Sequence, residues 1–251
     1  MWSWYRTQLQ QFGFIEATFL LFRVVVSRIK VILANELLPA RVACPCCGWS
    51  GRRYYDYIET GYTTRNAACP QCDSHPRHRA FVLWLRNEYR LQAKAGIAVV
   101  FAPEESLRPL WESAPDLRIF RVDLEAKRNV DALVDIQLMP LTSDSVDLLW
   151  CHHVLEHIED DFAGIRELNR VLRTDSGELI VSVPMLLGSE TKEYGFPNLR
   201  ESGHWRIYGD DFVDRLTAAG FEVQPGIIKL TEAEASRYGI VSEPFYVCRK
   251  P

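Results

Sequence analysis

Four cysteines of this chain are spaced as two metal-binding turns. Cys44 and Cys47 form one C-x-x-C pair, and Cys69 and Cys72 form a second pair after 21 intervening residues. Each C-x-x-C turn directs two thiolates to one point, and two such turns give the tetrahedral four-sulfur site that zinc prefers. The sequence therefore predicts a closed, structural zinc site with these four ligands, in a small module whose fold depends on the metal.

Other interpretations of the cysteines stay open. Cys46 lies inside the first pair and could exchange with a neighbour, while His75 or His78 could replace a thiolate. The thiols could instead be buried or redox-active. The two pairs and the lack of a secretory signal in Met1–Gln11 favour a reducing compartment over disulfides. We therefore expect a cytoplasmic protein, with peripheral membrane attachment as the alternative.

A strand–helix–strand unit lies in the second half of the chain. Residues 146–151 form a short apolar run that is typical of a buried strand. Residues 159–172 place apolar side chains on one helical face, and Gly177 precedes a second strand at residues 179–183. This order forms a right-handed parallel crossover, which predicts a doubly wound α/β sheet. Further strands are expected at residues 96–101, 118–122, 132–134, 221–223 and 245–248.

The residues of this unit resemble a known family. The chain reads VDLLWCHHVLEHI from Val146 and RVLRTDSGELIVSVP from Arg170. These two runs are similar to the segments after strand four and before strand five of class I S-adenosylmethionine-dependent methyltransferases of the type 11 group. The resemblance covers about residues 96–221. It implies a seven-stranded Rossmann-like sheet, and S-adenosylmethionine as the cofactor.

The resemblance also implies which residues contact the cofactor. Open α/β sheets bind ligands at the carboxyl ends of their strands. Asp123 lies at such an end, 22 residues after Phe101, and would bind the ribose. Glu104 would bind the amino group of the methionine moiety. Cys151 has a second interpretation, as a thiol of the apolar core. The expected cofactor contacts are Ala102, Glu104, Asp123, Asp135, Ile136, Cys151 and His152, with Asp135 and Ile136 at the adenine.

The first turn of the expected sheet departs from the family pattern. It reads Ala102-Pro103-Glu104, and no glycine occurs between Gly96 and Gly164. Glycine is favoured where the backbone must approach a ligand closely. A protein that keeps the fold but has lost cofactor binding is therefore one alternative function.

Three residues are expected on the acceptor side. Methyl transfer needs an aligned acceptor and removal of its proton, and a histidine near its neutral form suits that step. His153 is the candidate base at the mouth of the cleft, while His157 is interpreted as structural. His204 and Arg206 lie in a long insert at residues 185–207 and are the candidate acceptor contacts, with a self-packed loop as the alternative.

The first forty residues predict an amphipathic helix. Four charged residues interrupt its apolar runs, so the pattern does not favour a membrane-spanning helix. The helix could pack on its own domain, pair with a second subunit, or lie on an anionic membrane surface through its basic residues. Its apolar stripe is Phe12, Ile15, Phe19, Phe22, Val26, Ile29, Leu33 and Leu37, and the basic residues are Arg23, Arg28 and Lys30.

We expect three parts: a leader helix at residues 1–40, a zinc-ribbon-like module at 41–79 and a methyltransferase-like domain at 80–251. Residues 1–95 hold 13 Lys and Arg against 6 Asp and Glu, so an anionic partner is one interpretation. The expected activity is methyl transfer from S-adenosylmethionine to a small-molecule, sugar or lipid-linked acceptor. RNA methylation is the alternative, and nucleic acid is disfavoured because no dense Lys/Arg stripe occurs.

Overall fold

The computed structural model describes residues 2–60, 62–126, 129–241 and 243–251. The chain forms two compact units. Unit 1 consists of Met1–Leu83 with Lys229–Ser242, and unit 2 consists of Trp84–Ile228 with Glu243–Pro251. A short segment near the carboxyl end of the chain therefore folds with the amino-terminal unit.

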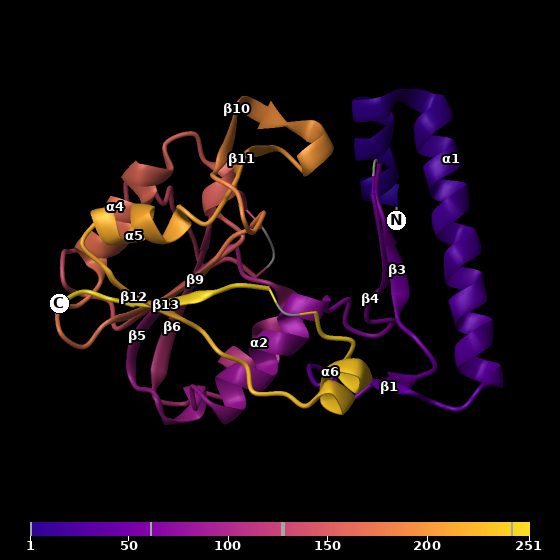
Figure 1. The fold of residues 1–251 in the computed structure, drawn as a ribbon, viewed down its shortest axis with the longest axis horizontal. Coiled ribbons are helices and arrows are strands. Elements are labelled where there is room, and N and C mark those ends of the chain that lie inside the picture. Colours follow the sequence, from indigo (N-terminus) through magenta and orange to yellow (C-terminus); the bar gives the residue numbers. More distant parts are fainter. Residues whose placement is uncertain (1, 61, 127–128, 242) are drawn as a thin grey trace. The chain divides into compact units, whose positions relative to one another are not determined.

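Unit 1 begins with a helix that folds back on itself. Helix α1 spans Trp2–Leu37, but Gly13 lies outside helical geometry with φ 81° and ψ 172°. This left-handed φ is one that glycine adopts without steric cost. Figure 1 shows the short first segment of α1 beside the longer second segment, and the hydroxyls of Tyr5 and Thr18 are 3.0 Å apart across them.

The two faces of α1 have different surroundings. Ala17, Leu20 and Val31 are buried, and the Ser27 hydroxyl donates to Asp56 at 2.8 Å, so this face packs within unit 1. The predicted apolar stripe lies on the opposite face. Its exposed members are Ile15, Phe19, Phe22, Ile29, Leu33 and Leu37, with Phe19 at 64% and Phe22 at 65% exposure. The expectation that the stripe packs on its own domain is therefore not met.

The rest of unit 1 is built from short strands and two helices. The hairpin expected between the cysteine pairs is present as β3 and β4, which pair antiparallel. Helix α6 starts with a capping box in which Thr231 and Glu234 satisfy each other's backbone amides. The elements are β1 (Val42–Ala43), β2 (Ser50–Gly51), β3 (Tyr55–Ile58), β4 (Thr63–Ala68), α2 (Pro76–Asn87, which continues into unit 2) and α6 (Glu232–Tyr238). In the described residues, no helix has the length and apolar character needed to span a membrane.

Unit 2 is organised around a seven-stranded sheet. Its order is β12-β13-β9-β8-β5-β6-β7, in which β13 runs antiparallel to both neighbours and the other central strands are parallel. Strands β8 and β9 are buried at every position, as expected for central strands covered on both faces. The doubly wound sheet predicted from the sequence is confirmed. The strands are β5 (Gly96–Phe101), β6 (Leu117–Asp123), β7 (Ala132–Leu133), β8 (Leu148–His152), β9 (Glu178–Ser182), β12 (Glu222–Pro225) and β13 (Tyr246–Arg249).

The helices of unit 2 position the loops at the carboxyl ends of these strands. Helix α4 (Asp161–Val171) is capped by Asp160, whose carboxylate accepts from the Ala163 amide at 2.9 Å. Helix α5 (Phe212–Ala218) lies next to α4, as Figure 1 shows, and Arg215 bonds Asp161 at 2.8 Å between them. Short helices connect the strands: η1 (Leu91–Ala93), η2 (Glu105–Leu107), α3 (Arg108–Trp111), η3 (Leu155–His157) and η4 (Leu199–Glu201).

The long insert after β9 is more ordered than its sequence suggests. It contains β10 (Lys192–Asn198) and β11 (His204–Ile207), which pair antiparallel around η4. The sequence predicts a long insert here, with a self-packed loop as one interpretation. The backbone pairing instead forms a hairpin that carries His204 and Arg206.

Candidate functional site

A cavity of about 400 Å³ opens at the carboxyl ends of β5, β6 and β8 in unit 2. Strand β5 lies at the point where the strand order reverses, and open α/β sheets bind their ligands there. The volume lies within the range of small-molecule sites. The cavity is lined by Phe101, Ala102, Val122, Asp123, Leu124, Glu125, Val134, Ile136, His153, Val154, His157 and Ile158.

Two lining residues hold unusual backbone conformations. Ala102, directly after β5, has φ 45°, and His153, directly after β8, has φ 53°. Non-glycine residues with positive φ are uncommon and cluster at binding sites. Ala102 therefore gives the glycine-free first turn the left-handed backbone that glycine adopts easily, so the turn keeps a glycine-like path at the cavity.

Of the residues expected to contact the ribose and the adenine, two line the cavity and one does not. Asp123 ends β6 and lines the cavity, where its carboxylate accepts from the Glu125 amide at 3.1 Å. Ile136 is buried and contributes an apolar wall. Asp135 is exposed and is not among the lining residues; its carboxylate accepts from the Gln137 amide at 2.8 Å.

Three other expected cofactor contacts lie behind the cavity wall or beside it. Cys151 belongs to the apolar core of unit 2, and burial raises the pKa of its thiol well above the ordinary value. His152 is buried, and its Nδ1 bonds the Ser182 hydroxyl on β9. Glu104 lies 3.8 Å from His152 Nε2 and lines a neighbouring cavity of about 200 Å³. Cys151 is not among the residues that line the cavity, and its place in the core fits the interpretation as a core thiol.

The histidines at the mouth of the cavity surround a buried carboxylate. His153 Nδ1 lies 3.2 Å from Glu156, which is fully buried at η3. The ring of His157 lies edge to face with that of His204, with centroids 4.7 Å apart. Burial lowers the pKa of His204 to about 4, so this imidazole is neutral at physiological pH. His157, predicted to be structural, lines the cavity, and Glu156, for which no role was predicted, is buried beside His153.

Arg206 has a different role from the one expected. It is almost completely buried and donates to the carbonyl oxygens of Leu155 at 3.2 Å and Ile158 at 2.7 Å. Its Nε also bonds Glu193 at 2.9 Å. Because its donors are used within the fold, Arg206 holds β11 against η3 and does not reach into the cavity. This corrects its prediction as an acceptor-contacting residue and makes it a positioning residue.

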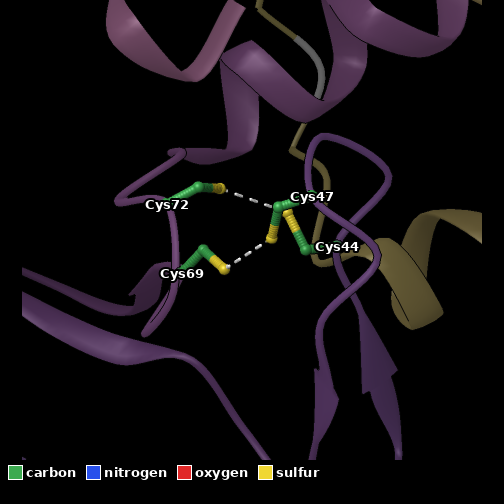
Figure 2. A group of neighbouring side chains, drawn as sticks. All are labelled: Cys44, Cys47, Cys69 and Cys72. Atoms are coloured by element: carbon green, nitrogen blue, oxygen red, sulfur yellow. Dashed lines mark hydrogen bonds between the residues drawn. The ribbon is translucent and has the colours of Figure 1, made fainter. Parts of the chain in front are cut away.

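The four paired cysteines come together in unit 1. Figure 2 shows Cys44 and Cys47 facing Cys69 and Cys72, and all four sulfur atoms lie within 4.8 Å of one another. The sulfur atoms of Cys44 and Cys72 are 3.7 Å apart, as are those of Cys47 and Cys69. All are free thiols. Four converging thiols without a disulfide fit the donor set of a structural zinc site.

The local backbone explains this convergence. The Cys44 amide bonds the Trp49 carbonyl at 2.7 Å, and the Cys69 amide bonds the Ser74 carbonyl at 3.0 Å, so each pair sits in a tight turn. Gly48 with φ 78° and Asp73 with φ 57° make the left-handed steps that close these turns. Each turn thereby directs its two sulfur atoms to the same point.

One buried arginine fixes the second turn, and the sequence analysis missed it. The Arg79 side chain is completely buried and donates to the carbonyls of Ser74 at 2.6 Å and Tyr238 at 2.6 Å. Its guanidinium also stacks over the Tyr54 ring at 3.9 Å. Arg79 therefore ties the second cysteine turn to the segment that contains α6, a contact between residues 159 positions apart in the chain.

Comparison with known proteins supports the resemblance. Residues 114–181 match the family model described as "Methyltransferase domain". A malonyl-[acyl-carrier protein] O-methyltransferase of Gallionella capsiferriformans (strain ES-2) is 33% identical over 99 residues, which is 38% of this chain and 33% of that protein. The chain thus spans about a third of the length of this curated relative. The predicted resemblance to the class I methyltransferases is confirmed for this segment.

Solved structures of low sequence identity were also found to be similar to this chain. An S-adenosylmethionine-dependent methyltransferase from Mesorhizobium loti is 12% identical with a TM-score of 0.50, covering 67% of this chain and 96% of that chain. A SAM-dependent methyltransferase from Archaeoglobus fulgidus is 12% identical with a TM-score of 0.46, covering 66% and 91%. The first of these confirms the Rossmann-like methyltransferase fold of the sheet.

Proposed function

Because residues 114–181 match the methyltransferase domain family, we propose that this chain is an S-adenosylmethionine-dependent methyltransferase. The observation that carries the proposal is the cavity at the carboxyl ends of β5, β6 and β8, with Asp123 on its wall. Asp123 would bind the ribose hydroxyls, and Ile136 would lie against the adenine. Asp135 remains a candidate for the adenine amino group from the exposed end of β7.

The bound cofactor would supply a methyl group on a positively charged sulfur atom. The chain's own residues have to align the acceptor with that methyl and take up the acceptor's proton. His153 lies at the cavity mouth with Nδ1 3.2 Å from the Glu156 carboxylate, a contact that orients its ring. We assign His153 the role of proton acceptor, with His204 on the acceptor side.

A small, sugar or lipid-linked acceptor fits the cavity better than RNA. Asp123 and Glu125 are among the described lining residues, and none of these is Lys or Arg. A polyanionic acceptor would need basic residues near the site of transfer. The relative from Gallionella capsiferriformans is named for an acyl-carrier-protein-linked acceptor, which favours a small group presented at the cavity mouth. RNA methylation stays the second candidate because of the basic residues in unit 1.

The cysteine turns are the second cofactor site of this proposal. Cys44, Cys47, Cys69 and Cys72 would hold one zinc ion whose coordination is complete, so it would stabilise unit 1 and take no part in methyl transfer. The seven free cysteines fit a reducing compartment such as the cytoplasm.

For the exposed face of α1 we infer a second copy of this chain as the partner. From Ile15 to Leu33 the stripe repeats at alternating intervals of four and three residues, and Leu37 follows four residues later. This is the spacing of a helix–helix seam. A membrane surface is the alternative occupant, because Lys30 and Arg23 border the same face.

Calorimetric titration with S-adenosylmethionine and S-adenosylhomocysteine tests the activity proposal. The unmutated protein should bind both ligands. In the Asp123→Ala variant the lost hydrogen bonds to the ribose, each about 1.5–3 kcal/mol before water compensates, should weaken binding on the order of tenfold or more. Asp116 is the matched control, since it is exposed just before the opposite end of the same strand, and Asp116→Ala should bind normally.

Three results would each contradict a part of the proposal. If the unmutated protein binds neither ligand, the chain is a non-catalytic protein that retains the fold. If Asp123→Ala and Asp116→Ala bind with equal affinity, the ribose does not lie at Asp123. Tight binding of structured RNA that weakens steeply with salt would replace the small acceptor with RNA.

A further inference from the structure

The Glu156 carboxyl group is buried in unit 2, next to histidines of the cavity. The residue is fully buried in η3, and neither carboxylate oxygen accepts a hydrogen bond from the residues that the structure describes. The ion-pairing group found beside it is His153 Nδ1, at 3.2 Å, which is positively charged only when protonated. A buried carboxylate of this kind is unfavourable unless a cation neutralises it.

Two imidazoles converge on this carboxylate. One ligand atom from each of Glu156, His157 and His204 lies within 4.8 Å of the others. His157 follows Glu156 in η3, and His204 comes from β11, so two separate elements supply the three groups. Small side-chain rotations would bring the three atoms onto one ion, whose bonds to nitrogen and oxygen are about 2.0–2.2 Å long.

The surrounding fold holds the three groups together. Arg206 lies two residues after His204 and donates to the carbonyls of Leu155 and Ile158, which flank Glu156 and His157. The buried guanidinium therefore fixes the strand that carries His204 against the short helix that carries the other two groups. The cluster is built by tertiary contacts and does not depend on one flexible loop.

We propose that Glu156, His157 and His204 form a binding site for one divalent transition-metal ion. Two imidazoles and one carboxylate are a donor set for zinc and other first-row transition ions, whereas calcium and magnesium prefer oxygen ligands throughout. The site is distinct from the cysteine turns in both donor type and compact unit. His153 stands beside Glu156, with Nδ1 3.2 Å from the carboxyl group, and is not one of the three ligands.

The position of the site points to the class of acceptor; this step rests on the proposed methyl transfer. His157 lines the cavity, so an ion held there keeps coordination positions that face the cavity. An acceptor with a hydroxyl or carboxylate oxygen would occupy such a position. The ion would hold that oxygen and, for a hydroxyl, lower its pKa so that the proton would pass more easily to His153, the proposed proton acceptor.

The test measures metal binding alone. Purified full-length protein is dialysed against Zn²⁺, and bound zinc is quantified by elemental analysis. The Glu156→Gln and His204→Ala variants should each bind one zinc per chain fewer than the unmutated protein. Glu159→Gln is the matched control, because Glu159 is exposed three residues along the same segment, and it should bind as the unmutated protein does.

The cysteine site serves as an internal check on folding. Both variants should keep the zinc that Cys69→Ser loses, which shows that a missing equivalent comes from the cavity site and not from an unfolded chain. Equal zinc contents in the unmutated, Glu156→Gln and His204→Ala proteins would overturn the inference. If the protein binds S-adenosylmethionine but holds no zinc that depends on Glu156, the metal site is wrong and the proposed function stands. If it holds that zinc but does not bind S-adenosylmethionine, only the proposed function is wrong.

Discussion

At the scale of single residues, the cavity is shaped by backbone conformations that cost free energy. Ala102 and His153 both hold a positive φ, at the carboxyl ends of the neighbouring strands β5 and β8. A left-handed conformation costs a non-glycine residue roughly 1–2 kcal/mol. The flanking strands fix both residues in this geometry, because the Ala102 amide bonds the Val122 carbonyl and the His153 amide bonds the Ser182 carbonyl. Strain of this kind at a cavity wall is typical of residues that position a ligand.

Glu178, on strand β9, is a residue of the central sheet that pairs with several polar and charged side chains. Its carboxylate accepts from Tyr89 at 2.7 Å, Lys94 at 2.7 Å and Arg249 at 2.6 Å. Burial alone would raise the pKa of Glu178, but the hydrogen bonds from Lys94, Tyr89 and Arg249 lower it below the ordinary value of 4.5. Its stabilising contribution is therefore complete above about pH 4.5 and is lost as the pH falls through the lower folded-state pKa.

We expect Glu178→Gln to lower the free energy of unfolding by about 2–3 kcal/mol at neutral pH. This is the low end for a buried ion pair because Lys94 and Arg249 are partly exposed. The variant should also lose less stability than the parent between about pH 6 and pH 3, because the titrating carboxylate is gone. Urea unfolding across this range measures both effects. The exposed Glu190→Gln is the control, and equal acid sensitivity of the Glu178→Gln and parent proteins would refute the assignment.

At the scale of elements, the two cysteine turns make a prediction about metal content. Cys69→Ser removes one of four converging sulfur ligands, so the chain should lose one zinc equivalent and the turn should unfold. Cys46→Ser should keep the metal, because Cys46 is buried beside the site but is not among the four converging thiols. Elemental analysis with limited proteolysis of unit 1 measures both. Loss of zinc from Cys46→Ser with retention by Cys69→Ser would mean that the ligand set is different.

How far the sequence predicts the elements depends on where their contacts are formed. The strand at 96–101 follows from its apolar run, since a buried strand must be apolar on both faces, whereas the seven-stranded sheet was implied by the family resemblance. The β10–β11 hairpin was not predictable in this way, because its first strand contains Gly195 and Pro197 and is largely exposed. The hydrogen bonds of Arg79, and those that hold Arg206 against η3, go to backbone carbonyl oxygens, which the residue types of the sequence do not reveal.

At the scale of the whole molecule, chain order and compact units do not coincide. Residues Lys229–Ser242 fold with unit 1, although they lie between β12 and β13 of the unit 2 sheet. Arg79 bonds the carbonyls of Tyr238 and Gly239 at 2.6 and 2.8 Å, so the returning segment is fixed beside the second cysteine turn.

The exposed face of α1 is the feature of the whole molecule that most requires a partner. Burying one large apolar side chain gains about 1.5–3 kcal/mol of free energy. The stripe has six exposed members, so covering it with a partner would be strongly favourable. The alternating three- and four-residue spacing lets two such helices interlock along one seam. A symmetric pair would cover the same patch on both copies.

We therefore expect light scattering to give twice the mass of one chain. The Phe22→Glu/Ile29→Glu variant should be monomeric, because a carboxylate buried at a seam without a partner costs several kcal/mol, or on the order of 100-fold or more in affinity. Lys30→Glu is the control, since it alters the charge of an exposed residue beside the seam and should remain dimeric. If the parent is monomeric and floats with anionic vesicles, whereas Phe22→Glu/Ile29→Glu and Lys30→Glu do not, the face binds a membrane surface and the dimer is wrong. That outcome would also favour a lipid-linked acceptor for the cavity of unit 2.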